Sequence, residues 1–171
     1  MNATRRTIAD HVRANPGVHF NAVVRDLDLA PGQVQYHLKR LRKGDSVVTD
    51  EIRGRTHIYP PGYDDWERSA LAVFRRETAR DLLVHLLDAG ETTPAALADE
   101  LGVARSTVEW HLDNLSGDDL VAKRREGNRV YLEPARPEAT AELLGEVTPS
   151  LPERMVDRFT KLVDGLVEEG P

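Results

Sequence analysis

The 171-residue sequence contains no cysteine, and this absence excludes disulfide bonds, thiolate metal ligands and cysteine nucleophiles together. Long hydrophobic runs are also missing: the longest is about the segment 69–74, which is far too short to span a membrane. The N-terminal residues 1–6 carry two arginines and are not followed by the apolar segment of a secretory signal. We therefore expect a cytoplasmic protein with no membrane partner.

Sequence motifs that mark catalysis are likewise missing. The chain has no glycine-rich phosphate loop and no Gly-x-Ser-x-Gly motif, and no pair of carboxylates has a context that marks a general acid and base. The six histidines lack the His-x-x-x-His spacing of helical metal sites. We therefore expect no enzymatic activity, no metal and no cofactor.

Lysine is scarce, and the positive charge is unevenly placed. The chain has 4 lysines, 19 arginines and 29 acidic residues, for a net charge of −6. Residues 1–62 carry a net charge of +4, residues 63–134 carry −6 and residues 135–171 carry −4. An acidic chain is not the usual footprint of a nucleic-acid binder, but here the positive charge is concentrated in one segment.

An internal repeat organises the chain. A shift of 74 residues aligns residues 4–60 with residues 78–134 without a gap, and the best stretch places residues 27–41 over residues 101–115. Both copies predict two helices, a tight turn, a third helix and a β-hairpin. In the first copy these elements are expected at 7–14, from an N-cap at Asn21 to Leu27, at 31–43, and at 47–52 with 56–59. In the second copy the elements after the first helix are expected from Thr93-Pro94, at 105–115, and at 120–125 with 129–132.

Three helices followed by a hairpin describe a winged helix-turn-helix. The expected fold class is therefore mainly α with small β-wings: two tandem winged helix-turn-helix domains plus C-terminal helices. We expect an N-terminal winged-helix domain at 1–62, a linker helix with the second winged-helix domain at 63–134, and a helical tail at 135–171.

Two helical regions lie outside the repeated pattern. The linker predicts either one long helix or two helices joined near Thr78, with an apolar face that belongs to the core. The tail predicts helices at 137–147 and from Leu151 to about Glu168. The apolar stripe of the last helix predicts a homodimer contact, with docking on the second unit as the alternative.

The motif Val-x-x-His-Leu-x-x-Leu occurs at 34–41 and again at 108–115. It resembles the recognition helices of archaeal and bacterial winged-helix transcriptional regulators. The whole arrangement is similar to tandem winged helix-turn-helix regulators of haloarchaea, over about 134 of the 171 residues. The acid-rich, lysine-poor composition also resembles proteins of salt-loving archaea, although a high-GC genome gives the same arginine bias. The resemblance implies binding to double-stranded DNA. His37 and His111 occupy one position in both copies, on the edge of the inward face of the helix, so we expect them to be packed or to face phosphate rather than to bind a metal.

In this fold the third helix enters the major groove. Helical geometry turns Val34, Leu38 and Leu41 inward and leaves polar and basic side chains outside. We expect base-edge contacts from Gln33, Gln35 and Tyr36, base or phosphate contacts from Arg40, phosphate contacts from Lys39, Arg42 and Lys43, and wing contacts to the backbone or minor groove from Arg53 and Arg55.

The third helix of the second copy carries Glu109 and Asp113, which phosphates repel. Two interpretations remain open. In the favoured one, the second unit contacts DNA through Arg105, Ser106 and Thr107 on its helix and Lys123, Arg124, Arg125 and Arg129 on its wing. In the other, it is a scaffold or dimerisation unit, with Trp110 in a protein contact.

The sequence thus predicts a sequence-specific DNA-binding transcriptional regulator that occupies promoter DNA and blocks or recruits the basal transcription machinery. The alternative is a non-enzymatic winged-helix scaffold within a transcription-related complex, which the net charge of −6 and the acidic second copy favour. A third hypothesis is a regulator that binds a small molecule between its two units.

Overall fold

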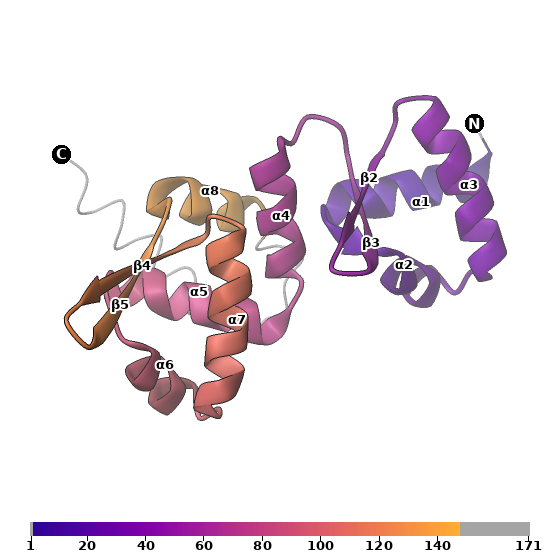
Figure 1. Cartoon of the computed structure of the whole chain (residues 1–171). Helices are drawn as coiled ribbons and strands as arrows, with labels where there is room; N and C mark the ends of the chain where they lie inside the picture. The colour runs from indigo at the N-terminus through magenta and orange to yellow at the C-terminus, as the bar shows by residue number, and fades with distance from the viewer. Residues whose placement is uncertain (1, 148–171) are drawn as a thin grey trace. The chain divides into compact units, whose positions relative to one another are not determined.

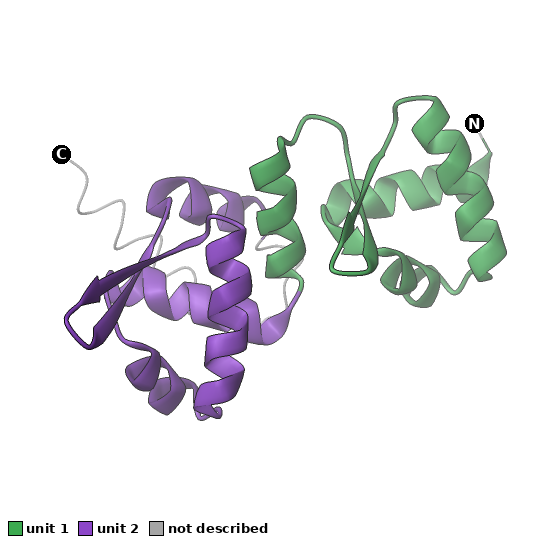
Figure 2. Ribbon diagram, in the orientation of Figure 1, with its two compact units in different colours: residues 1–75 green, residues 76–171 purple. Residues whose placement is uncertain are grey.

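A computed structural model describes residues 2–147, which form eight helices and five strands (Figure 1). The chain forms two compact units, residues 1–75 and residues 76–171, coloured separately in Figure 2. This division falls between Arg75 and Arg76, whereas the sequence predicts a boundary after residue 62. Within the described residues, no helix is long and apolar enough to cross a membrane.

The first unit combines four helices with a small antiparallel sheet. Its elements are α1 (Ala3–Ala14), β1 (Val18–His19), α2 (Phe20–Leu27), α3 (Pro31–Lys43), β2 (Val48–Ile52), β3 (Arg55–Tyr59) and α4 (Asp65–Phe74). The strand order is β1-β3-β2, and the hairpin β2–β3 forms the wing. The turn residues Arg53 and Gly54 have φ angles of 50° and 75°, as a two-residue hairpin turn requires.

The core of the first unit lies where α1, α2 and α3 meet the sheet. Ile8 and Val12 of α1 pack with Val23 of α2 and with the sheet residue Ile58. From α3, Val34, Leu38 and Leu41 are buried, as the helical spacing predicted. Burial of this stripe fixes the rotation of α3 about its axis, so the opposite face is exposed to solvent.

Two local predictions were wrong, both at the first residues of helices. α1 begins at Ala3 rather than Thr7, because the side chain of Asn2 caps it by accepting a hydrogen bond from the Arg5 N–H at 3.2 Å. The N-cap of α2 is His19 rather than Asn21. The imidazole Nδ1 of His19 accepts from the Ala22 N–H at 3.2 Å, so the helix begins at Phe20.

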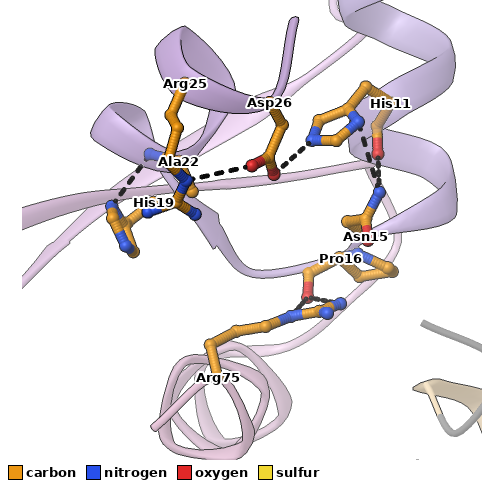
Figure 3. A network of polar contacts seen from close by, with 8 residues as sticks. All are labelled: His11, Asn15, Pro16, His19, Ala22, Arg25, Asp26 and Arg75. Atoms are coloured by element: carbon orange, nitrogen blue, oxygen red, sulfur yellow. Dashed lines mark hydrogen bonds and ion pairs between the residues drawn. The ribbon is translucent and has the colours of Figure 1, made fainter. Parts of the chain in front are cut away.

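Side-chain hydrogen bonds attach α4 to the rest of the first unit. The Tyr59 hydroxyl donates to the Arg68 carbonyl at 2.7 Å, and Arg68 Nε lies 2.7 Å from Asp50 Oδ2. After the last turn of α4, Arg75 donates from Nε and Nη2 to the Pro16 carbonyl at 3.1 and 2.8 Å (Figure 3). These contacts explain why the division of the chain falls after α4 and not before it.

The second unit repeats this plan, again with four helices. Its elements are α5 (Glu77–Ala89), α6 (Pro94–Leu101), α7 (Arg105–Gly117), β4 (Val121–Glu126), β5 (Arg129–Pro134) and α8 (Pro137–Val147). An isolated bridge between Thr92 and Leu132 stands where β1 pairs with β3 in the first unit. The linker therefore forms two helices, and the helix expected at 137–147 is confirmed. The helix expected from Leu151 lies outside the described residues.

The shift of 74 residues relates the two units element by element. Both ends of α2 and α3 map in this way onto the ends of α6 and α7. The left-handed residue that ends α2, Asp28, corresponds to Gly102 after α6, and the hairpin turn at 53–54 corresponds to that at 127–128. The sequence repeat is therefore a repeat of structure, and the predicted fold class is confirmed.

Candidate nucleic-acid interface

The outer face of α3 is basic and free of acids. The exposed cations are Lys39, Arg40, Arg42 and Lys43, and no aspartate or glutamate occurs in the helix. None of these four side chains forms an ion pair with any other residue in the range 2–147. Since no carboxylate neutralises them, their charge is available to an external anion.

Tyr36 stands on the same face and organises one of these cations. It is 52% exposed, and within the described chain only Trp110 is another exposed large hydrophobic side chain. The Arg40 guanidinium carbon lies 4.9 Å from the centroid of the Tyr36 ring. This cation–π contact holds Arg40, which is exposed, against the ring.

A groove of about 640 Å³ lies between α3, the first residues of α2 and the wing of the first unit. Of the predicted contacts, Gln35, Lys39 and Arg42 line it from α3, and Arg55 lines it from β3. No acidic residue lines this groove. A concave surface with three cations and no acid is suited to a phosphate backbone.

The other predicted contacts of the first unit lie outside this groove. Tyr36, Arg40 and Lys43 are exposed on α3, and Arg53 is exposed at the tip of the wing. Gln33 is folded back, because its Oε1 accepts from the Ala30 N–H at 3.3 Å and so caps the helix. The side chain of Gln33 must release this bond before it can contact a base.

His19 also lines the groove, although sequence reasoning missed it. The Ala22 N–H donates to His19 Nδ1 (Figure 3). The neutral ring therefore carries its proton on Nε2. Burial lowers the pKa of His19, with further lowering from the nearby Arg55 and His57. No spacing or motif in the sequence marks His19, so its place in the groove is seen only in the folded structure.

The repeated histidines of α3 and α7 are packed against aromatic rings. His37 is buried, and its ring lies edge-on to Tyr36 at 5.1 Å between centroids. Burial lowers the pKa of His37, with smaller contributions from Arg5 and Arg40. His111 makes the same contact with Trp110 at 4.9 Å. Among residues 2–147, no cluster of three or more His, Asp or Glu side chains is arranged to hold a metal ion.

The second unit has a groove in the same place, of about 560 Å³, with a mixed lining. It is lined by the predicted cations Arg105, Lys123, Arg125 and Arg129, together with Glu109. Ser106 and Thr107 are exposed on α7 outside this groove. Two of the cations have carboxylate partners: Arg105 Nε lies 3.7 Å from Glu109, and Lys123 Nζ lies 2.6 Å from Asp113.

Arg124 has the most carboxylate neighbours of the predicted cations. Its Nη2 lies 2.7 Å from Glu91 and its Nε lies 3.7 Å from Glu133, while Nη1 pairs with Glu126. The guanidinium also stacks over Tyr131, 4.8 Å from the ring centroid. The hydrogen bond to Glu91, with the charges of Glu126 and Glu91, raises the pKa of Arg124 above its ordinary value. These contacts make Arg124 part of the wing structure.

Two helix-turn-helix families match the chain, one over each unit. A family described as an N-terminal HTH domain matches residues 2–71, and a family described as a helix-turn-helix domain matches residues 76–124. The chain therefore carries two helix-turn-helix domains in tandem, as the sequence predicted.

Comparison with individual proteins gives one curated relative and several partial structural likenesses. The chain is 29% identical over 133 residues to an uncharacterized HTH-type transcriptional regulator of Methanocaldococcus jannaschii, a match that covers 76% of this chain and 33% of the relative. The chain thus spans about a third of the length of that relative. Reduced HlyU of Vibrio cholerae shares 27% identity over 46% of this chain and 81% of its own, with a TM-score of 0.42. YusO of Bacillus subtilis shares 14% identity over 81% of this chain and 95% of its own, with a TM-score of 0.39.

Proposed function

We propose that this protein is a sequence-specific DNA-binding transcriptional regulator that works in a salt-rich cytoplasm. The observation that carries the proposal is the acid-free basic face of α3 beside an acid-free groove. The two helix-turn-helix domains and the archaeal relative described as a transcriptional regulator support it. The function is recognition, and it involves no catalytic step.

In this proposal the outer face of α3 enters the major groove of double-stranded DNA. Gln35, Tyr36 and Arg40 contact base edges, because amide and guanidinium groups match the donors and acceptors displayed there. Lys39 and Arg42, which line the groove beside the wing, hold phosphates and position the helix. Occupancy of a promoter then blocks or recruits the basal transcription machinery.

We further propose that the protein acts as a homodimer. A two-fold symmetric dimer presents two copies of α3 to two half-sites of opposite orientation. The DNA sequence selected by the chain is therefore expected to be an inverted repeat. Selection of a single asymmetric half-site, together with a monomeric mass by sedimentation equilibrium, would exclude the dimer and leave DNA recognition intact.

The double variant Arg40→Ala with Lys43→Ala tests the role of α3. It removes one base or phosphate contact and one phosphate contact, so we expect affinity to fall by about 10- to 100-fold. Affinity is measured by fluorescence anisotropy on a duplex that the wild-type chain enriches from a randomised library.

The matched control is Arg13→Ala with Arg136→Ala, which removes the same two positive charges. Arg13 pairs with Asp10 and Arg136 pairs with Asp119, and neither lies on α3 or a wing. We expect the affinity of this control to differ from that of the wild type by less than about threefold, whereas the α3 variant loses at least about 10-fold. Equal affinity of the α3 variant and the wild type would contradict the assignment of α3.

The scaffold function remains the second candidate, since α7 carries acids and an exposed Trp110. It makes the opposite prediction for the wild-type chain. A scaffold would enrich no duplex from the library, at any salt concentration that keeps the protein folded.

A further inference from the structure

The two units carry their positive charge on different elements. Under the shift of 74 residues, the four cations of α3 correspond to uncharged or acidic residues of α7. The replacements are Lys39 by Asp113, Arg40 by Asn114, Arg42 by Ser116 and Lys43 by Gly117. Formal charge is therefore +4 on α3 and −1 on α7. The inward residues Val108, Leu112 and Leu115 remain buried, so the fold is kept while the outer face has changed.

The remaining charges of α7 are directed at one another and at the wing. Arg105 is the only lysine or arginine of α7 and pairs with Glu109 one turn later. Asp113 forms an ion pair with Lys123 of β4. Insertion of α7 into a DNA groove would bring Glu109 and Asp113 close to phosphates and break these pairs. Like charges placed together in this way disfavour a complex.

The wing of the second unit has the opposite character. Lys123 and Arg125 of β4 stand where β2 of the first unit has Thr49 and Glu51. Arg129 keeps the cation present at the equivalent Arg55. Arg125 and Arg129 are exposed, line the groove of this unit and form no ion pair with any residue between 2 and 147. Two guanidinium groups of the wing are thus available to phosphates.

We infer that the second unit holds DNA through its wing, by phosphate contacts from Arg125 and Arg129, and that α7 reads no bases. This inference rests on the proposed function and deepens it: sequence is read by the first unit alone, and the second unit adds affinity without specificity. Phosphate contacts strengthen binding to all sequences alike, whereas base contacts distinguish them.

The test uses the full chain with Arg125→Ala and Arg129→Ala together. Affinity is measured by fluorescence anisotropy on the wild-type-enriched duplex and on an unrelated duplex, over a series of KCl concentrations. We expect affinity for both duplexes to fall by the same factor, on the order of tenfold, and the salt slope to fall by about 2. The sequence enriched from a randomised library stays that of the wild type.

The matched α7 variant is Ser106→Ala with Thr107→Ala, which removes the exposed hydroxyls at the start of that helix. It is expected to leave affinity, salt slope and enriched sequence unchanged. A second wing variant, Arg125→Lys with Arg129→Lys, keeps both charges and is expected to keep most of the affinity, because a phosphate accepts a point charge. Circular dichroism melting curves check that all three variants fold as the wild type does.

The unfavourable outcomes are distinct. A changed enriched sequence in the α7 variant would overturn the inference, because α7 would then read bases. Unchanged affinity and salt slope in the wing alanine variant would also overturn it, because the wing would then lie off the DNA. Both results leave the proposed function standing, whereas failure of the wild type to enrich any duplex overturns the proposed function and the inference together.

Discussion

His19 joins the stability of the first unit to the surface of its groove. Its ring caps α2 through Nδ1, and the same ring lines the groove next to Arg55. The cap needs an unprotonated Nδ1, since a protonated nitrogen donates and cannot accept the Ala22 N–H. One side chain therefore links helix formation to pH.

The pH dependence of unfolding checks this link. The pKa of His19 is lowered from 6.5, so its contribution to stability is fully present above pH 6.5 and is lost as the pH falls from there toward the lowered pKa. The variant His19→Asn keeps a good N-cap and does not titrate. We expect the midpoint of thermal unfolding to fall less between pH 7 and pH 5 in His19→Asn than in the wild type, as measured by circular dichroism.

His37 is present in both the wild type and His19→Asn, so its own lowered pKa affects the pH dependence of both proteins equally. Parallel curves for His19→Asn and the wild type would show that the His19 ring is not the titrating cap.

At the scale of elements, α4 depends on contacts that lie across the first unit. Arg68 connects α4 to β2 through its ion pair with Asp50. The Arg68 side chain is largely buried, whereas that of Asp50 is 41% exposed. The hydrogen bond to Asp50 raises the pKa of Arg68, which therefore stays charged. The hydrogen bond from Tyr59 to the Arg68 carbonyl adds a second connection to the wing.

Loss of the Arg68 side chain is expected to destabilise the first unit by about 1 kcal/mol, because a charge-assisted hydrogen bond with one partly exposed partner is lost. The variant Arg68→Ala is compared with Arg136→Ala, whose ion pair with Asp119 is exposed. Urea unfolding is followed by the fluorescence of Trp66 in α4, with Trp110→Phe as the common background. Equal midpoints for the two variants would show that Asp50 does not stabilise α4.

Elements with local signals were predictable from the sequence. The apolar spacing of α3, Pro31 at its start and Gly102 after α6 placed those helices correctly, because helical periodicity and backbone preference act over a few residues. The assignment of α4 to the first unit was not predictable. It depends on Arg75 contacting Pro16 at a separation of 59 residues, which no local pattern contains.

The candidate interface shows the same limit. The basic face of α3 follows from its sequence, since residues three and four apart share a helix face. The pairing of Arg124 with Glu91 does not follow, because the two residues are 33 positions apart and meet only when the wing folds back to α5. Only tertiary contacts therefore distinguish a cation that is available to DNA from one, such as Arg124, that is part of the wing structure.

At the scale of the whole molecule, negative charge dominates outside the first unit. The chain carries a net charge of −6, although the first unit, residues 1–75, carries +3. Repulsion among the excess carboxylates opposes the folded state at low ionic strength and is screened as salt is added.

We therefore expect the midpoint of thermal unfolding to rise by about 5 °C between 0.1 and 1 M KCl, where the Debye length falls from about 10 to about 3 Å. Differential scanning calorimetry across this range measures it. A midpoint that falls with KCl would show that attractive ion pairs, such as that of Arg124 with Glu91, outweigh repulsion.

The strict correspondence between the two units also bears on how such a chain changes over generations. In α3 and α7, the inward positions keep valine and leucine, and the four outward cation positions share no residue. Mutations that change what the outer helix face binds therefore leave the core unchanged. Selection for a stable fold does not remove such mutations. Duplication of the domain thus allows one copy to keep its binding specificity while the surface of the other copy evolves a different function.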